Sequence, residues 1–200
     1  MNTPPIAEQI TGSIVTLRFC RPVERNPLSI NTLNTLDKTL KRLSEDDSVR
    51  VIILTGSEDI FLSGANIREL ETLDTDAAKA FSHKGQVLTQ TIADNKAVTI
   101  AAINGYCMGG GLDFALACHI RIASSSAIFA HPGAKLGIIT GWGGTQRLPR
   151  IIGRTRALEM FATARRMSSA EALKAGLITQ IADPVLDAAM VLASQIISTS

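Results

Sequence analysis

The chain has 200 residues, of which 46% are hydrophobic and 19% are charged, and 20 basic residues against 18 acidic ones give a net charge of +2. This balance excludes a disordered chain, which combines low hydrophobicity with high net charge. It gives no support to a nucleic-acid-binding protein, because such proteins usually carry a basic excess. Only 4% of the residues are aromatic, so a platform for stacking bases is not expected. The length suits one well-buried domain and is short for two.

The cysteines and the absence of targeting signals favour a reducing compartment. Cys20, Cys107 and Cys118 show no C-x-x-C spacing, which favours buried free thiols over a disulfide framework or a zinc site. The three histidines are scattered without helical pairing to carboxylates, so no metal is expected. The first residues lack the pattern of a secretory signal, and no apolar stretch reaches the length of a membrane span. We therefore expect a cytoplasmic protein without a membrane span.

Strand and helix signals alternate along the chain. In chain order, the patterns predict a strand over 13–20, a polar loop over 21–27, a helix capped by Ser29 or Asn31 that continues through Leu43, a buried strand over 51–54 and helical sequence from about 67 to 92. They then predict a buried strand over 98–103, a helix from Gly109 through His119, a strand over 120–123 and helices over 155–164, 168–175 and 185–200. This rhythm predicts an α/β fold with ligands at loops that follow strand ends.

Two loops combine a preceding strand, small residues and a following helix. One contains Ser63-Gly64-Ala65-Asn66, and the other runs from Asn104-Gly105 to Gly109-Gly110-Gly111. The N–H groups at a helix start lack partners within the helix and can stabilise an anion. Two such loops side by side could therefore offer two donors to one developing oxyanion. Glycines between a strand and a helix are also commonly structural, and neither loop matches a dinucleotide-binding or P-loop motif.

Asp113 lies in the first turn of the helix that follows the second loop. One interpretation is an acidic residue favoured by the positive end of the helix dipole. The other is a general acid or base beside the oxyanion donors.

Four motifs follow one another along nearly the whole chain: IILTGSEDIFLSGANI, AAINGYCMGGGLDFALACHIRIA, LGIITGWGGTQRLPRIIG and SSAEALKAGLI. Together they resemble the crotonase family, also called the enoyl-CoA hydratase/isomerase family. The resemblance implies an α/β spiral of ββα units in a single domain over 1–200. Its core spiral would cover about 10–182, and a helical C-terminal region would begin at about 183. It also implies a homotrimer or hexamer.

The resemblance implies an acyl-CoA thioester as the substrate and no separate cofactor, because coenzyme A is part of that substrate. The thioester oxygen would lie between the backbone N–H groups of Ala65 and Gly110, and Asp113 would transfer the proton. The residues implied to bind the substrate or its coenzyme A are Arg25, Ser63, Gly64, Ile67, Arg68, Gly109 and Gly133. For the two arginines, solvated surface positions are the alternative interpretation.

This chain departs from the family at the acid/base positions. Hydratases of the family generally use two glutamates, and here the first position is Asp113 while Gly133 replaces the second. One hypothesis is an isomerase or specialised hydratase in which Asp113 alone moves the proton. Another is that His131 or an exogenous anion supplies the missing base, as in naphthoate synthases, which share the glycine and a G-W-G segment. A third is an acyl-CoA-binding protein that has lost catalysis. For His131, the simpler alternative is a loop histidine paired with a backbone carbonyl.

Family members generally extend further at the C-terminus than Ser200. We therefore expect this chain to lack a C-terminal region, to expose apolar surface and to be less stable or differently assembled.

Overall fold

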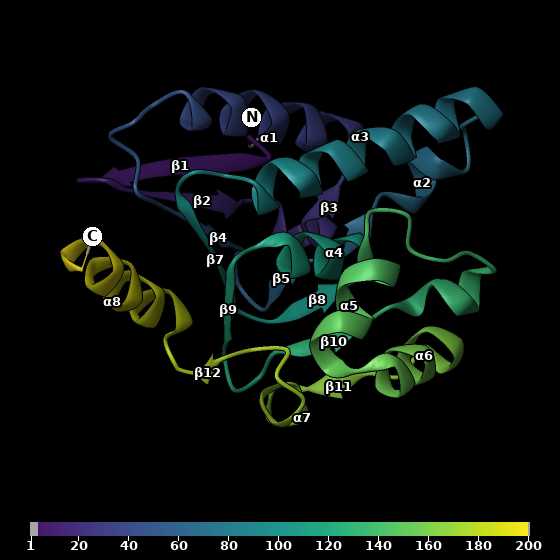
Figure 1. The fold of residues 1–200 in the computed structure, drawn as a ribbon. Helices are drawn as coiled ribbons and strands as arrows, with labels where there is room; N and C mark the ends of the chain where they lie inside the picture. Colours follow the sequence, from purple (N-terminus) through teal and green to yellow (C-terminus); the bar gives the residue numbers. More distant parts are fainter. Residues whose placement is uncertain (1–3, 200) are drawn as a thin grey trace.

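A computed structural model describes residues 4–199 of the chain (Figure 1). The strands are β1 Ile6–Thr11, β2 Ile14–Phe19, β3 Pro27–Leu28, β4 Val51–Thr55, β5 Ile60–Leu62, β6 Gly64–Ala65, β7 Val98–Ile103, β8 Tyr106–Met108, β9 Ile120–Ala123, β10 Ile128–Ala130, β11 Met167–Ser168 and β12 Gln180–Ile181. The α-helices are α1 Ile30–Ser44, α2 Ile67–Leu70, α3 Thr75–Ala93, α4 Gly110–Ala117, α5 Gly144–Ile152, α6 Arg154–Thr163, α7 Ser169–Lys174 and α8 Val185–Ser198. Two 3₁₀ turns are η1 Pro22–Glu24 and η2 Pro132–Leu136.

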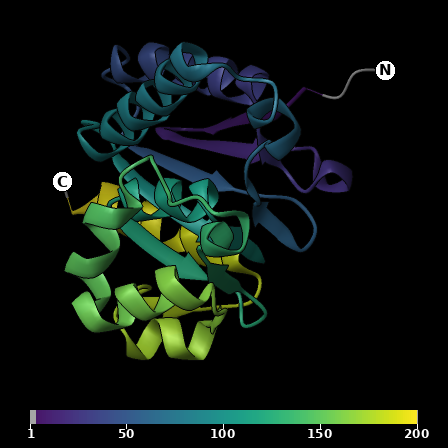
Figure 2. The same cartoon turned by 90° about the vertical axis from the view of Figure 1, so that its right-hand side faces the viewer.

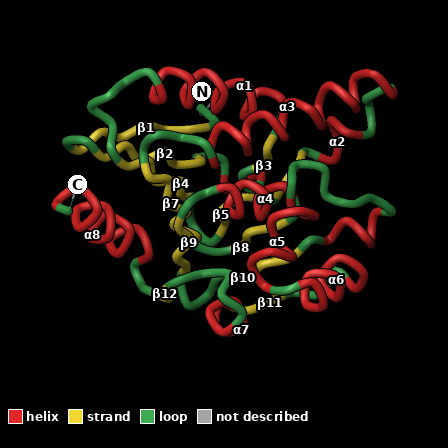
Figure 3. Tube along the Cα trace, in the orientation of Figure 1, coloured by secondary structure: helices red, strands yellow, loops and turns green. Residues whose placement is uncertain are grey.

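The chain winds as a spiral in which successive strands enter two different sheets. The larger sheet has the order β1-β2-β4-β7-β9-β12, and the smaller one has the order β11-β10-β8-β5. In the larger sheet, β4, β7 and β9 are parallel neighbours. They are followed in the chain by β5, β8 and β10, respectively, which are parallel neighbours in the smaller sheet. Figure 3 shows these strands in the interior, with helices around them. The predicted spiral of ββα units is confirmed.

The larger sheet separates two apolar clusters because side chains alternate between the faces of a strand. In β4, Ile52 and Leu54 face the main core, whereas Val51 and Ile53 face the second cluster. Helices α1 and α3 lie on the main-core side, and α8 covers the opposite face (Figures 1 and 2). The continuous apolar runs predicted as doubly buried strands are therefore β4 and β7.

Helix α1 begins as its sequence predicts. The Ser29 hydroxyl accepts a hydrogen bond from the backbone N–H of Thr32 at 3.1 Å, so Ser29 rather than Asn31 is the N-cap. Its buried residues recur at helical spacing and pack into the main core: Leu33, Leu36, Leu40 and Leu43.

Several predicted boundaries are wrong. The segment predicted as helical sequence from about 67 to 92 is divided into α2 and α3, because the Asp74 carboxylate caps a new helix by accepting from the Ala77 N–H at 2.8 Å. The helix predicted through His119 ends at Ala117. Strand β1, the short strands of the smaller sheet and α5 were not predicted. Within residues 4–199, none of the helices is long and apolar enough to cross a membrane.

Candidate active site

The two glycine-containing loops meet in the structure. A Cβ atom on Gly64, the first residue of β6, would lie 3.0 Å from the backbone nitrogen of Gly110, the first residue of α4. Gly64 has a φ of +97°, a conformation that L side chains rarely adopt. A Cβ on Gly110 would lie 2.4 Å from the Trp142 ring. Glycine is therefore required at both positions so that β6, the start of α4 and the indole of Trp142 can approach one another.

Beside this junction lies a cavity of about 350 Å³ with mostly apolar walls. Its aromatic side is made by Phe81 and Trp142, whose rings lie 5.3 Å apart between centroids. Its lining residues are Ser63, Gly64, Ala65, Ile67, Leu70, Ala78, Phe81, Ser82, Gly109, Gly110, His131, Pro132, Gly133, Leu136, Ile138, Ile139, Thr140, Gly141 and Trp142. A concave apolar site with few polar groups is the usual form of a small-molecule site.

Seven of the ten sequence-predicted site residues line this one cavity: Ser63, Gly64, Ala65, Ile67, Gly109, Gly110 and Gly133. Arg25 and Arg68 are exposed and lie outside it. Asp113 also lies outside the lining, because it is fully buried behind the cavity wall. The structure thus brings both loops to the cavity and places the carboxyl group one layer deeper.

The carboxylate of Asp113 is held from the cavity side by the segment that precedes α5. Its Oδ2 atom accepts a short hydrogen bond from the Thr140 hydroxyl and a second, of 3.3 Å, from the Trp142 backbone N–H. Its Oδ1 atom has no hydrogen-bond partner within the described residues. A Cβ on Gly144 would lie 2.0 Å from Oδ1, so α5 begins directly against the carboxylate.

Burial raises the pKa of Asp113 to about 6, since removal from water penalises the charged form. The hydrogen bonds from Thr140 and Trp142 and the positive charge of Arg147 oppose this rise. A carboxyl group whose pKa lies near neutrality can both accept and return a proton. The electrostatics therefore suit general acid–base chemistry.

His131 follows β10, lines the cavity and lies close to Asp113. Its Nε2 atom is 3.6 Å from Asp113 Oδ1, and one face of its ring packs against Phe161 with the ring centroids 4.9 Å apart. Burial lowers the pKa of His131 to about 4, so the ring is neutral at pH 7 and the contact is not a charged pair. Neither ring nitrogen has a hydrogen-bond partner within residues 4–199. The predicted alternative, pairing with a backbone carbonyl, is therefore wrong for the described residues.

Sequence reasoning did not single out Thr140 or Phe81, and it used Trp142 only as part of a G-W-G segment. The signal for Thr140 was present, since it stands in the motif LGIITGWGGTQRLPRIIG. Nothing in that motif indicates that its hydroxyl reaches a carboxylate 27 positions earlier. Only the packing of the segment over α4 reveals the contact.

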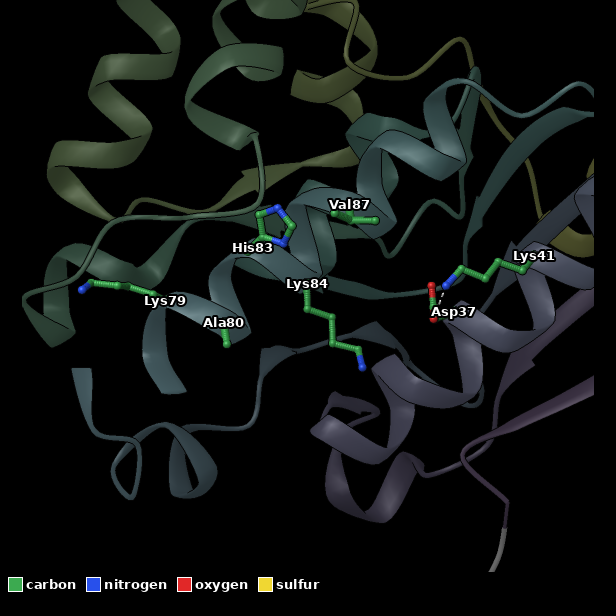
Figure 4. A pocket seen from close by; sticks show the side chains of 7 residues that line it. All are labelled: Asp37, Lys41, Lys79, Ala80, His83, Lys84 and Val87. Carbon is green, nitrogen blue, oxygen red and sulfur yellow. Dashed lines mark hydrogen bonds and ion pairs between the residues drawn. The ribbon is translucent and has the colours of Figure 1, made fainter. Parts of the chain in front are cut away.

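A second depression lies on the surface between α1 and α3 (Figure 4). It has a volume of about 490 Å³ and is lined by Asp37, Lys41, Lys79, Ala80, His83, Lys84 and Val87. Lys41 pairs with Asp37 at 2.9 Å, and in Figure 4 the side chains of Lys79, His83 and Lys84 point in different directions. These basic side chains therefore do not converge on one point. In the described part of the chain, no group of three or more His, Cys, Asp or Glu residues could hold a metal ion.

Comparison with known proteins identifies the family. Residues 9–200 match the family model described as enoyl-CoA hydratase/isomerase. The chain belongs to the enoyl-CoA hydratase/isomerase family. The family predicted from the four motifs is therefore confirmed.

Individual members of this family agree with the match. The chain is 35% identical to a short-chain-enoyl-CoA hydratase of Clostridium acetobutylicum, covering 94% of this chain and 74% of the relative. It is 36% identical to a crotonyl-CoA hydratase of Syntrophomonas wolfei, covering 86% of this chain and 66% of the relative. Among solved structures, it is similar to an enoyl-CoA hydratase from Bacillus anthracis, with a TM-score of 0.93, 34% identity, and coverage of 97% of this chain and 77% of the other.

Proposed function

We propose that this chain is an acyl-CoA enzyme of the hydratase/isomerase type that stabilises a thioester enolate and transfers a proton with Asp113. One observation carries the proposal. Two strand–glycine–helix loops meet at an apolar cavity, and a buried carboxyl group whose pKa is about 6 lies directly behind the cavity wall.

The chemistry follows from where charge develops. Removal of a proton from a carbon conjugated with the thioester breaks the C–H bond and moves its electron pair onto the thioester oxygen. The backbone N–H groups of Ala65 and Gly110 would donate to that oxygen, and fixed donors of this kind contribute roughly 3 kcal/mol each. Return of the proton to another carbon gives isomerisation. Addition of the hydroxide and a proton of one water molecule to the two carbons of the double bond gives hydration, and the reverse elimination releases water.

The path of the proton is constrained by the burial of Asp113. Its Oδ2 atom meets the cavity wall through the hydroxyl of Thr140, which lines the cavity. The hydroxyl can pass its own proton to Oδ2 while it accepts the substrate proton, and the reverse transfer restores both groups. Asp113 thereby changes from an anion to a neutral acid as the substrate becomes an enolate.

The loop containing Ser63, Gly64 and Ile67 would lie along the coenzyme A, and Gly109 and Gly133 line the same cavity. Arg25 and Arg68 are exposed and lie outside the cavity, so they are available to the phosphates of a bound coenzyme A.

The reaction needs no cofactor besides the coenzyme A of the substrate. The trimeric or hexameric state and the cytoplasmic location stay predictions; light scattering tests the former.

The alternative with an exogenous base beside Gly133 receives less support. A Cβ atom on Gly133 would lie 2.5 Å from the carbonyl oxygen of Ile138. The Ile138 carbonyl therefore occupies the position where a side chain at residue 133 would begin, and an exogenous base could not take that position. The other alternative, acyl-CoA binding without turnover, is separated from the proposal by experiment.

The test is incubation of the protein with 2-enoyl-CoA and 3-enoyl-CoA substrates in heavy water, read by mass spectrometry. We expect deuterium uptake at the α- or γ-carbon; a gain of water marks hydration, and its absence marks isomerisation. Asp113→Ala should abolish uptake while coenzyme A affinity, measured by calorimetry, stays nearly unchanged. Asp187→Asn, on the exposed side of α8, is the matched control. Wild-type protein that binds these substrates without any exchange would leave only the binding function.

A further inference from the structure

Two buried polar atoms beside the cavity lie near each other without hydrogen-bond partners within the described residues. They are Oδ1 of Asp113 and Nε2 of His131, which lie 3.6 Å apart. A buried polar group without a partner costs about 1–3 kcal/mol, so two such groups side by side call for an explanation. Each atom can supply what the other lacks, since the carboxylate oxygen accepts and an imidazole N–H donates.

The two oxygens of Asp113 have different surroundings. Oδ2 receives the Thr140 hydroxyl and the Trp142 N–H, whereas Oδ1 faces His131. A shift of roughly 0.7 Å by either side chain would bring Nε2 and Oδ1 to hydrogen-bond distance. The Phe161 ring packs against the imidazole at an interplanar angle of 42° and limits its movement on that side.

We propose that His131 is a positioning residue that donates its Nε2–H to Oδ1 of Asp113, which leaves Oδ2 for proton exchange with the cavity through Thr140. The catalytic consequence of this hydrogen bond rests on the proposed function. The hydrogen bond itself and the tautomer of His131 do not depend on that function. No proton is lost or gained by His131 during turnover. The substrate proton passes to the Thr140 oxygen as the Thr140 proton passes to Oδ2, and the return step reverses both transfers.

The other charged or titratable groups that act on Asp113 come from two elements. Arg147, on α5, stabilises the carboxylate, and its own Nη1 atom lies 3.3 Å from the carbonyl oxygen of Trp142. Cys107, on β8, has its pKa raised by burial and by the charges of Cys118 and Asp113, so it stays a neutral thiol. His131 is therefore the titratable group in contact with Oδ1 within the described residues.

The first experiment is ¹⁵N NMR of the imidazole rings in the whole protein. The chain has three histidines, and His119 provides an internal reference, because its Nδ1 accepts the Thr99 N–H at 2.9 Å and its proton must be on Nε2. We expect His131 to be neutral at pH 7 with its proton on Nε2. In Asp113→Asn, the His131 signals should shift while those of His119 stay unchanged. A proton on Nδ1 of His131, or His131 signals that stay unchanged in Asp113→Asn, would overturn the proposal.

The second experiment measures deuterium exchange against pH for two variants. His131→Gln keeps an N–H donor near Oδ1, and His131→Phe keeps the ring packing and removes the donor. We expect about a tenfold lower kcat with little change in KM for His131→Phe, and substantial retention for His131→Gln. Equal losses in both variants would indicate a role in packing alone and contradict the proposal. If wild-type protein shows no exchange, the proposed function fails, while the tautomer measurement still decides the pairing.

Discussion

At the scale of single residues, the hydroxyl of Thr140 connects the buried Asp113 carboxylate to the cavity. The carboxylate is fully buried, and its Oδ2 atom bonds to the Thr140 hydroxyl, which belongs to the cavity lining. The apolar surroundings that raise the pKa of Asp113 to about 6 also exclude water from direct contact with it. In the proposed mechanism, proton exchange with a substrate would therefore depend on Thr140.

Replacing Thr140 tests this dependence. Thr140→Val removes the hydroxyl and keeps the shape of the side chain, so we expect deuterium exchange into enoyl-CoA substrates to fall by about 100-fold, a typical size for the loss of a proton-transfer group. Thr140→Ser keeps the hydroxyl and should retain most of the exchange. Rates are measured by mass spectrometry under saturating substrate. Equal rates in the valine and serine variants would contradict the role of the hydroxyl.

At the scale of elements, strong hydropathy patterns in the sequence predicted the strands they belong to. Strands without such a pattern form through pairing with neighbouring strands. The apolar runs of β4 and β7 predicted buried strands because both faces of these strands pack against apolar clusters. Strand β1 gave no such pattern, since only Ile6 of its six residues is buried and its pairing with β2 is through the backbone. The three-residue strands β5, β8 and β10 are too short to show a period, and they form because the spiral brings them side by side.

Helix α8 gives a test of how one element covers the larger sheet. Ala189 is fully buried in the cluster with Ile53 and Ile100, whereas Val191 on the same helix is 59% exposed. Ala189→Asp would place an unpaired charge against this face, and we expect a loss of at least about 3 kcal/mol in the free energy of unfolding. Val191→Asp is the matched control, with an expected change within about 0.5 kcal/mol. Urea denaturation measures both, and similar losses in the two variants would show that α8 does not pack as described.

At the scale of the whole molecule, Asp113 and His131 make opposite contributions to the pH dependence of stability. The pKa of Asp113 is raised from 3.8 to about 6 on folding, so between these values the folded protein holds a proton that the unfolded chain has lost. Stability from this group falls as pH rises through that window. The pKa of His131 is lowered from 6.5 to about 4, so stability from this group falls as pH decreases through its window.

The two contributions should nearly cancel between pH 4 and pH 6, because each shift amounts to about 3 kcal/mol. His131→Gln leaves the Asp113 contribution, and we expect that variant to gain stability relative to wild type as the pH falls from 6 to 4. Asp113→Asn leaves the His131 contribution and should lose stability relative to wild type over pH 6.5 to 4. Urea denaturation at pH 4.5, 5.5 and 7 provides the measurement. Identical pH dependence in wild type and both variants would contradict these burial effects.

The sequence was sufficient for the family, for the spiral of ββα units and for the two loops that carry Ala65 and Gly110, since each depends on contiguous residues in recognisable order. It did not determine that Asp113 lies behind the cavity wall, that Thr140 stands in front of it or that His131 faces its second oxygen. These three residues come from different elements, and their distances depend on how α4, β10 and the segment before α5 pack together. Burial, which shifts both pKa values and would set the proposed path of the proton, is a property of that packing alone.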